Sequence, residues 1–154
     1  MGCDIHSHAE RRNADGAWED IPELAPFDWR SYGMYGFLAG VRNYSAVTPI
    51  AEPRNIPDDA SKVVKSHFEA WECDAHNASW LSVTELVEFD YDTGMEDRRI
   101  ARQVGMNSWN GGCTAEAGEG RATTYREFLG EGFFEELAKL KTAGVERIVF
   151  WFDN

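Results

Sequence analysis

Long apolar runs are missing from this chain, and so are the common nucleotide-binding signatures. No stretch of about 18 consecutive apolar residues occurs, which argues against a membrane-spanning helix. The first residues lack the basic and apolar regions of a signal peptide, so we expect a soluble protein of the cytoplasm. The motifs GxGxxG and GxxxxGK[ST] are both absent, so a dinucleotide-binding fold and a P-loop have no support.

Cysteine and basic side chains are also scarce. The three cysteines are widely spaced and form no CxxC pair, which argues against a disulfide framework and a structural zinc site. Cys3 is expected to be a buried structural thiol. The 15 Lys and Arg face 27 Asp and Glu, for a formal net charge of -12. Such a surface repels DNA, RNA and anionic membranes, so neither nucleic acid nor membrane is an expected partner.

What the chain does contain fits one packed domain of α+β class. Its 154 residues are 43% hydrophobic and 13% aromatic, enough for a real core. Residues 3–12 and 17–21 flank the turn NADG and predict a β-hairpin. The closing run IVFWF is apolar on both faces and predicts a central, covered strand. We expect a small, mainly antiparallel sheet, built from the hairpin and the last strand and covered by helices on one face.

Capping patterns place the helices. A short helix is expected within 31–44, ending near Gly40, and another over 61–71, capped by Asp58 or Asp59. Capping boxes open helices at 82–89 and 124–144, the second divided near Gly130. Residues 98–105 predict a strand, and the Gly-rich stretch 106–121 predicts a surface loop.

The row Asp4, His6, His8 and Glu10 is the first place that suggests chemistry. On a strand, alternate residues share one face, so these polar side chains line up together. Asp4, His6 and His8, with Asp153 brought close by pairing of the first and last strands, are the ligands that a divalent metal would use. No metal is expected, because HxH alone is a weak signal and hydrogen bonding of the two histidines on the sheet face is the simpler explanation. The amidohydrolase barrel that carries HxH needs about 250 residues.

Two further places contain groups suited to a ligand. The stretch ECDAHNASW, expected to link two helices, puts His76 between Trp71 and Trp80. It suits either a bound base or sugar, or a structural turn anchored by two tryptophans. The pairs Arg42–Asn43 and Arg54–Asn55 border a proline-marked loop. Guanidinium groups bind phosphate, although pairing with one of the many acids is the simpler role for any single arginine.

Taken together, these residues predict one pocket. The side chains expected to line it are Asp4, His6, His8, Arg42, Asn43, Arg54, His76 and Trp80. A phosphorylated ligand would satisfy the arginines while Trp80 stacks on its base. If the protein is an enzyme, His6, His8 and His76 are the expected catalytic groups.

Five segments carry a resemblance to a known family: MGCDIH, RNY, AEPRNIPDD, DAHNASW and VFWFDN. Together the chain resembles an uncharacterised family of small bacteriophage and bacterial proteins, along almost its whole length. The resemblance implies a phage protein in the cytoplasm of a host bacterium, with an anti-defence role, rather than a particular mechanism.

In that setting, we expect a protein that binds and sequesters a phosphorylated, nucleotide-derived signalling molecule, without a cofactor. One alternative is a metal- or His-dependent phosphoesterase that cleaves such a signal. Another is an acidic inhibitor of a host protein. The sequence leaves a homo-oligomer open.

Overall fold

The structure is a computed structural model that describes residues 2–105 and 108–154, with the backbone alone over 100–114. The chain folds into two compact units. The first unit comprises Met1–Arg30, Ala51–Phe89 and Gly132–Asn154, and the second comprises Ser31–Ile50 and Asp90–Glu131. The expectation of a single domain stays a prediction. None of the helices in the described residues has the length and apolar character needed to cross a membrane.

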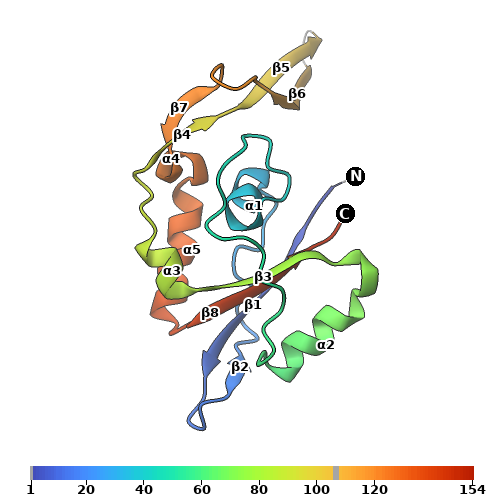
Figure 1. Cartoon of the computed structure of the whole chain (residues 1–154), viewed down its shortest axis with the longest axis vertical. Coiled ribbons are helices and arrows are strands. Elements are labelled where there is room, and N and C mark those ends of the chain that lie inside the picture. Colours follow the sequence, from blue (N-terminus) through green and yellow to red (C-terminus); the bar gives the residue numbers. More distant parts are fainter. Residues whose placement is uncertain (1, 106–107) are drawn as a thin grey trace. The chain divides into compact units, whose positions relative to one another are not determined.

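The first unit is built on an antiparallel sheet with strand order β2-β1-β8-β3 (Figure 1). The strands are β1 (Ile5–Arg12), β2 (Trp18–Asp20), β3 (His76–Ser82) and β8 (Arg147–Phe152). The predicted hairpin is confirmed, with β1 and β2 joined by a turn in which Gly16 has a positive φ of 78°. The predicted pairing of the first and last strands is also confirmed, with His6 opposite Trp151.

Strand β8 is covered on both faces, as its apolar run predicts. All six of its residues are buried, and β1 and β3 pair with its two edges. Its alternate residues give the sheet two faces. The histidine face of the sheet carries His6, His8 and Glu10 from β1, Trp80 from β3, and Arg147, Val149 and Trp151 from β8. Cys3, predicted to be buried, is fully inaccessible to solvent.

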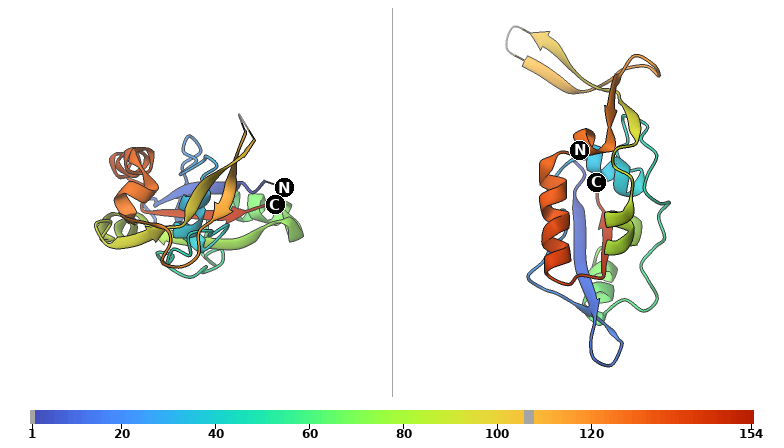
Figure 2. Two further views of the ribbon diagram at one scale, coloured as in Figure 1. Left: turned by 90° about the horizontal axis from the view of Figure 1, so that it is seen from above. Right: turned by 90° about the vertical axis from the view of Figure 1, so that its left-hand side faces the viewer.

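Helices lie on both sides of this sheet. Helix α2 (Lys62–Ala70) covers the histidine face through Val64, which packs with Val149 and Trp151. Helix α5 (Glu131–Thr142) lies on the opposite side (Figure 2). The α+β class and the antiparallel sheet are confirmed, whereas the sequence placed the helices on one face only. The remaining elements of this unit are the short α3 (Val83–Glu88) and the 3-10 turn η1 (Glu72–Asp74).

Two local predictions in this unit were wrong. The cap of α2 is Ser61 rather than Asp58 or Asp59, because the Ser61 hydroxyl accepts the hydrogen bond from the Val64 N–H. Residues 76–80, predicted as part of a loop, belong to β3 and pair with β8. The pattern was hard to see because the strand is irregular. Its register shifts between His76 and Ser79, where Asn77 has a φ of 49°.

The second unit contains α1 (Tyr32–Ala39), α4 (Tyr125–Leu129) and four strands, β4 (Gly94–Asp97), β5 (Arg99–Gly105), β6 (Ser108–Thr114) and β7 (Arg121–Thr124). Helix α1 ends at Gly40, as predicted, and begins after the cap Ser31. The predicted strand over 98–105 is β5. The Gly-rich stretch, expected as a loop, instead contributes β6 opposite β5, and its residues 106–107 lie outside the described residues.

A buried ion pair holds the centre of the histidine face. The Arg147 Nε donates to Glu10 Oε1 across 2.8 Å, and the two side chains are 5% and 0% exposed. The second Glu10 oxygen accepts a hydrogen bond of 2.7 Å from the Ser61 backbone N–H, at the start of α2. Strands β1 and β8 and the start of α2 are therefore joined through one carboxylate.

We expect Glu10→Gln to lower the free energy of unfolding by about 3 kcal/mol, because it replaces the buried counterion of Arg147 and leaves the exposed carboxylate of Asp59 to pair with its charge. Glu19→Gln is the matched control, since Glu19 pairs with Arg11 on the exposed surface of the same hairpin. That change should cost less than about 1 kcal/mol. Urea unfolding of both variants measures the difference, and equal small losses would show that the buried pair does not hold the sheet.

Candidate functional site

The polar row of β1 meets partners within the protein. The carboxylate of Asp4 accepts two hydrogen bonds from Arg30, at 2.9 and 2.6 Å, and these hold its pKa below the usual range. His6 lies 2.8 Å from Asp153, as the predicted strand pairing required. His8 and Glu10 likewise have acidic or basic neighbours within 3 Å. Much of the row that resembled a ligand set is therefore satisfied internally.

A chain of hydrogen bonds links His8 to helix α2. The Trp71 indole N–H donates to His67 Nε2 at 3.4 Å, so that nitrogen is the acceptor of the ring. His67 Nδ1 then carries the proton and donates to His8 Nε2 across 2.8 Å. His8 Nδ1 in turn donates to Asp20 across 2.9 Å. One arrangement of protons, with both imidazoles neutral, satisfies every link of this histidine relay.

His6 completes the group of rings beside the relay. Its ring contacts Trp71 with centroids 4.1 Å apart and planes tilted by 37°, and it stacks on Trp151 at 6.0 Å. Because His6 and His8 point at two different carboxylates, Asp153 and Asp20, their nitrogens do not converge on one point. Within the described residues, no group of three or more His, Cys, Asp or Glu is arranged to hold a metal ion.

Further along the same face, arginines and tryptophans alternate in a stack that we call the arginine–tryptophan ladder. Its order is Arg54, Trp80, Arg147, Trp18, Arg12. The guanidinium carbon lies 4.8 Å from the ring centre between Arg54 and Trp80, and 6.0 Å between Arg147 and Trp80. The corresponding distances to Trp18 are 3.7 Å from Arg147 and 4.9 Å from Arg12. Cation–π attraction thus ties β3, β8 and the hairpin together.

Two of the three arginines in the ladder form ion pairs with carboxylates, and the third does not within the described residues. Arg54 donates hydrogen bonds to both carboxylate oxygens of Glu85. These hydrogen bonds are the main reason that the pKa of Glu85 is lowered to about 2. Arg147 donates to Asp59 at 2.9 Å, and this bond lowers the pKa of Asp59. The Arg12 guanidinium has no carboxylate partner among the described residues. It is exposed, with only the Trp18 ring beneath it.

The ladder borders a pocket of about 790 Å³, which we call the ladder pocket. Its other walls come from the proline-marked loop, through Asn55, Ile56, Pro57 and Asp58, and from Ser82 and Glu146. Arg147 also lines it, and its Nη2 is buried without a hydrogen-bond partner among the described residues. The pocket combines aromatic, apolar and cationic walls, a mixture that suits an organic anion.

The structure brings some of the predicted site residues together. Arg54 and Trp80 are in contact at the ladder pocket, and His6 and His8 share their sheet face. His76 lies on the opposite face, because the irregularity of β3 turns it toward Phe152, with ring centroids 6.2 Å apart. Its Nε2 is buried without a hydrogen-bond partner in the described part of the chain. The expected meeting of His76 with His6 and His8 therefore does not occur.

Arg42 and Asn43 belong to the second unit. The Arg42 guanidinium lies over the Tyr32 ring, 5.8 Å from its centre. The Asn43 side chain donates to the Val47 carbonyl at 2.7 Å and accepts from the Val47 N–H at 2.9 Å. The amide of Asn43 therefore stabilises a local turn.

Sequence reasoning missed four residues of this face: Arg12, Trp18, His67 and Arg147. A signal existed for Arg147, because a charged residue at the start of an otherwise apolar, covered strand needs a buried partner. A second signal was the spacing of His67 and Trp71, which puts them on one side of a helix. Neither pattern shows which residue of another element lies against Arg147 or against His67.

Comparison with known proteins adds no family to this description. No family model matches the chain, and neither the curated proteins nor the solved structures contain a match. The resemblance to small phage proteins therefore stays a prediction.

The histidine relay predicts a pH dependence of stability. The pKa of His67 lies below its ordinary 6.5, first because part of the ring is removed from water and second because His8 is beside it. As the pH falls, His67 is therefore protonated at a higher pH in the unfolded chain than in the folded protein. Its contribution to stability is complete above pH 6.5 and declines as the pH falls toward the lowered pKa.

We expect His67→Gln to flatten this decline, as measured by urea unfolding at about pH 7.5 and about pH 5, on either side of the ordinary histidine pKa. Ser66→Ala, a change in the neighbouring helix residue that does not titrate, should retain the wild-type slope. Identical slopes in all three proteins would mean that His67 titrates alike in the folded and unfolded states.

Proposed function

We propose that the protein binds a small phosphorylated, nucleotide-like ligand in the ladder pocket and holds it. The observation that carries this proposal is the Arg12 guanidinium, which borders the pocket without a carboxylate partner among the described residues. Acids outnumber bases by 27 to 15 in this chain, so an arginine is more readily paired than left unpaired. An anion supplied by a ligand would complete the set of partners around Arg12.

The acids of the pocket do not remove this role. Asp59 is already engaged by Arg147 and by the Trp18 indole N–H at 3.1 Å. Glu146 accepts a hydrogen bond of 2.6 Å from the backbone N–H of Arg12 rather than from its guanidinium. The positive charge of Arg12 is therefore available to a phosphate, the group that guanidinium donors match best.

The opposite wall of the pocket suits a base. Ile56, Pro57 and the edge of the Trp80 ring, whose faces are covered by Arg54 and Arg147, provide apolar surface against which a base can pack. Asn55 and Ser82 add an amide and a hydroxyl that can donate to or accept from the edge of a base or a ribose. Phosphate at Arg12 and a base at Trp80 together describe a nucleotide.

Hydrolysis of such a ligand is a second candidate function, favoured by the histidine relay. His67 is reachable from solvent, and its Nδ1 is backed by His8 and Asp20 through bonds of 2.8 and 2.9 Å. The outer nitrogen of His67, Nε2, accepts the long hydrogen bond of 3.4 Å from the Trp71 indole, so it could exchange a proton with a ligand once that bond is released. In the phage setting that the resemblance implies, either sequestration or hydrolysis of a nucleotide signal would remove it from a host receptor.

The proposal is tested by titration calorimetry with ADP as the probe. We expect Arg12→Ala to weaken ADP binding by about 1.5–3 kcal/mol, the value of a hydrogen bond to a charged group. Arg11→Ala is the matched control, because Arg11 is the adjacent residue, faces the other way along β1 and pairs with Glu19. If ADP binds equally well to both variants, or not at all to the wild-type protein, the ladder pocket is not a nucleotide site.

Holding and hydrolysis are separated by following the phosphorus NMR signals of ADP after incubation with the protein. We expect the ADP to stay intact, since binding at Arg12 requires no reaction. Release of phosphate by the wild-type protein, lost in His67→Gln and retained in Ser66→Ala, would instead establish the second candidate function.

A further inference from the structure

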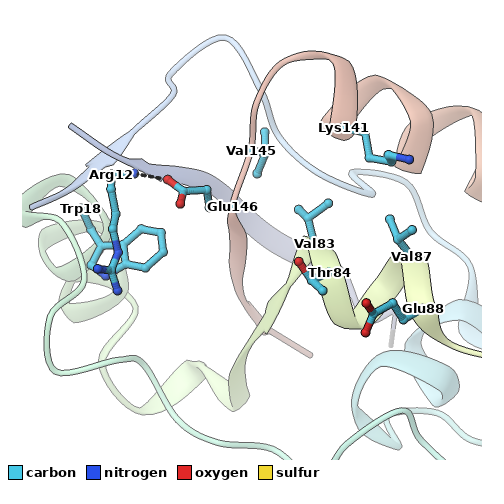
Figure 3. A pocket seen from close by; sticks show the side chains of 9 residues that line it. All are labelled: Arg12, Trp18, Val83, Thr84, Val87, Glu88, Lys141, Val145 and Glu146. Carbon is cyan, nitrogen blue, oxygen red and sulfur yellow. Dashed lines mark hydrogen bonds between the residues drawn. The ribbon is translucent and has the colours of Figure 1, made fainter. Parts of the chain in front are cut away.

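A second pocket, of about 560 Å³ and drawn in Figure 3, shares residues with the ladder pocket. The two pockets share three lining residues, Arg12, Trp18 and Glu146. Arg12 therefore lies where these two pockets meet, and it also lines a third pocket of about 370 Å³ together with Gly16, Ser61 and Lys62. Each pocket lies within the range of about 300–1,000 Å³ that accommodates a small molecule.

The second pocket differs in character from the first. Three valines, Val83, Val87 and Val145, line it, so we call it the valine pocket. Figure 3 shows Arg12 and Trp18 at one end and Lys141 with Val87 at the other. Val87 is 38% exposed, so part of its side chain is open to this pocket. The Lys141 ammonium has no carboxylate partner among the described residues.

We infer that the ligand has two ring-bearing groups joined through phosphate, with the phosphate at Arg12, one ring in the ladder pocket and the other in the valine pocket. This inference rests on the proposed function and extends it from a nucleotide to a dinucleotide-like molecule. The position of Arg12 carries it, because an anion bound there has a pocket on each side.

The chemistry of the valine pocket agrees with this assignment. Val83, Val87 and Val145 would cover the flat faces of a second ring, whose burial is favourable in proportion to its apolar area. Thr84 and Lys141 offer a hydroxyl and an ammonium group to the hydroxyls or ring nitrogens of the second nucleoside. A ligand with a single nucleoside would leave the exposed valine in water.

The test compares two probes that differ in the second nucleoside and in the one negative charge that its ester bond removes from the diphosphate. ADP carries one adenosine, whereas diadenosine diphosphate carries an adenosine at each end of the same diphosphate. We expect diadenosine diphosphate to bind about tenfold more tightly or better, the order expected for stacking one additional base. Equal affinities would overturn the two-ring ligand while leaving nucleotide binding intact. Failure of both probes to bind would overturn the proposed function as well.

A pair of matched variants locates the second ring. Val87→Gln puts a longer, polar and uncharged side chain into the valine pocket without disfavouring the helix. Val63→Gln makes the same change at another exposed valine, 56% exposed on α2 and outside both pockets. We expect Val87→Gln to reduce the preference for diadenosine diphosphate to less than about threefold with ADP binding unchanged, and Val63→Gln to have no effect. If the two variants behave alike, the second ring does not occupy the valine pocket.

Discussion

The ion pair between Glu10 and Arg147 is the constraint around which the histidine face is arranged. A buried guanidinium needs hydrogen-bond acceptors for its donors, and a buried carboxylate needs donors for its oxygens. Glu10 obtains them from Arg147 and from the Ser61 N–H, which anchors α2 to the sheet. Arg147 obtains them from Glu10 and Asp59, and Asp59 in turn holds the Trp18 indole. The register of β1 and β8 and the start of α2 follow from these requirements.

The same requirement produces the candidate site. The Nη2 of Arg147 still lacks a hydrogen-bond acceptor in the described residues, and the two sides of its guanidinium are bordered by the rings of Trp18 and Trp80. On their other faces, Trp18 contacts Arg12 and Trp80 contacts Arg54, the two ends of the arginine–tryptophan ladder. Arg54 is neutralised by Glu85, whereas Arg12 faces two pockets without a counterion among the described residues. An arrangement that stabilises the sheet thus leaves one cation available for binding.

Part of this site followed from local pattern. The alternation along β1 showed that its polar residues share a face, and the pairing of the first and last strands brought Asp153 to His6. The choice of Arg54 and Trp80 as neighbours was also sound, although Glu85 neutralises the arginine. The sequence did not point to His67, because its contact with His8 depends on the distance between a helix and a strand that are far apart in sequence. Only packing of α2 on the sheet brings it to His8.

The sequence by itself determined the hairpin, the capped starts of α3 and α4, the burial of Cys3 and the central place of β8. Each of these depends on neighbours a few residues away or on a continuous apolar run. Tertiary structure decided that residues 76–82 form a strand and that His76 faces away from the relay. It also decided which acids neutralise which arginines. In a chain with 27 acids, charge pattern alone does not select a partner, because that choice depends on distances that exist only after the strands have paired.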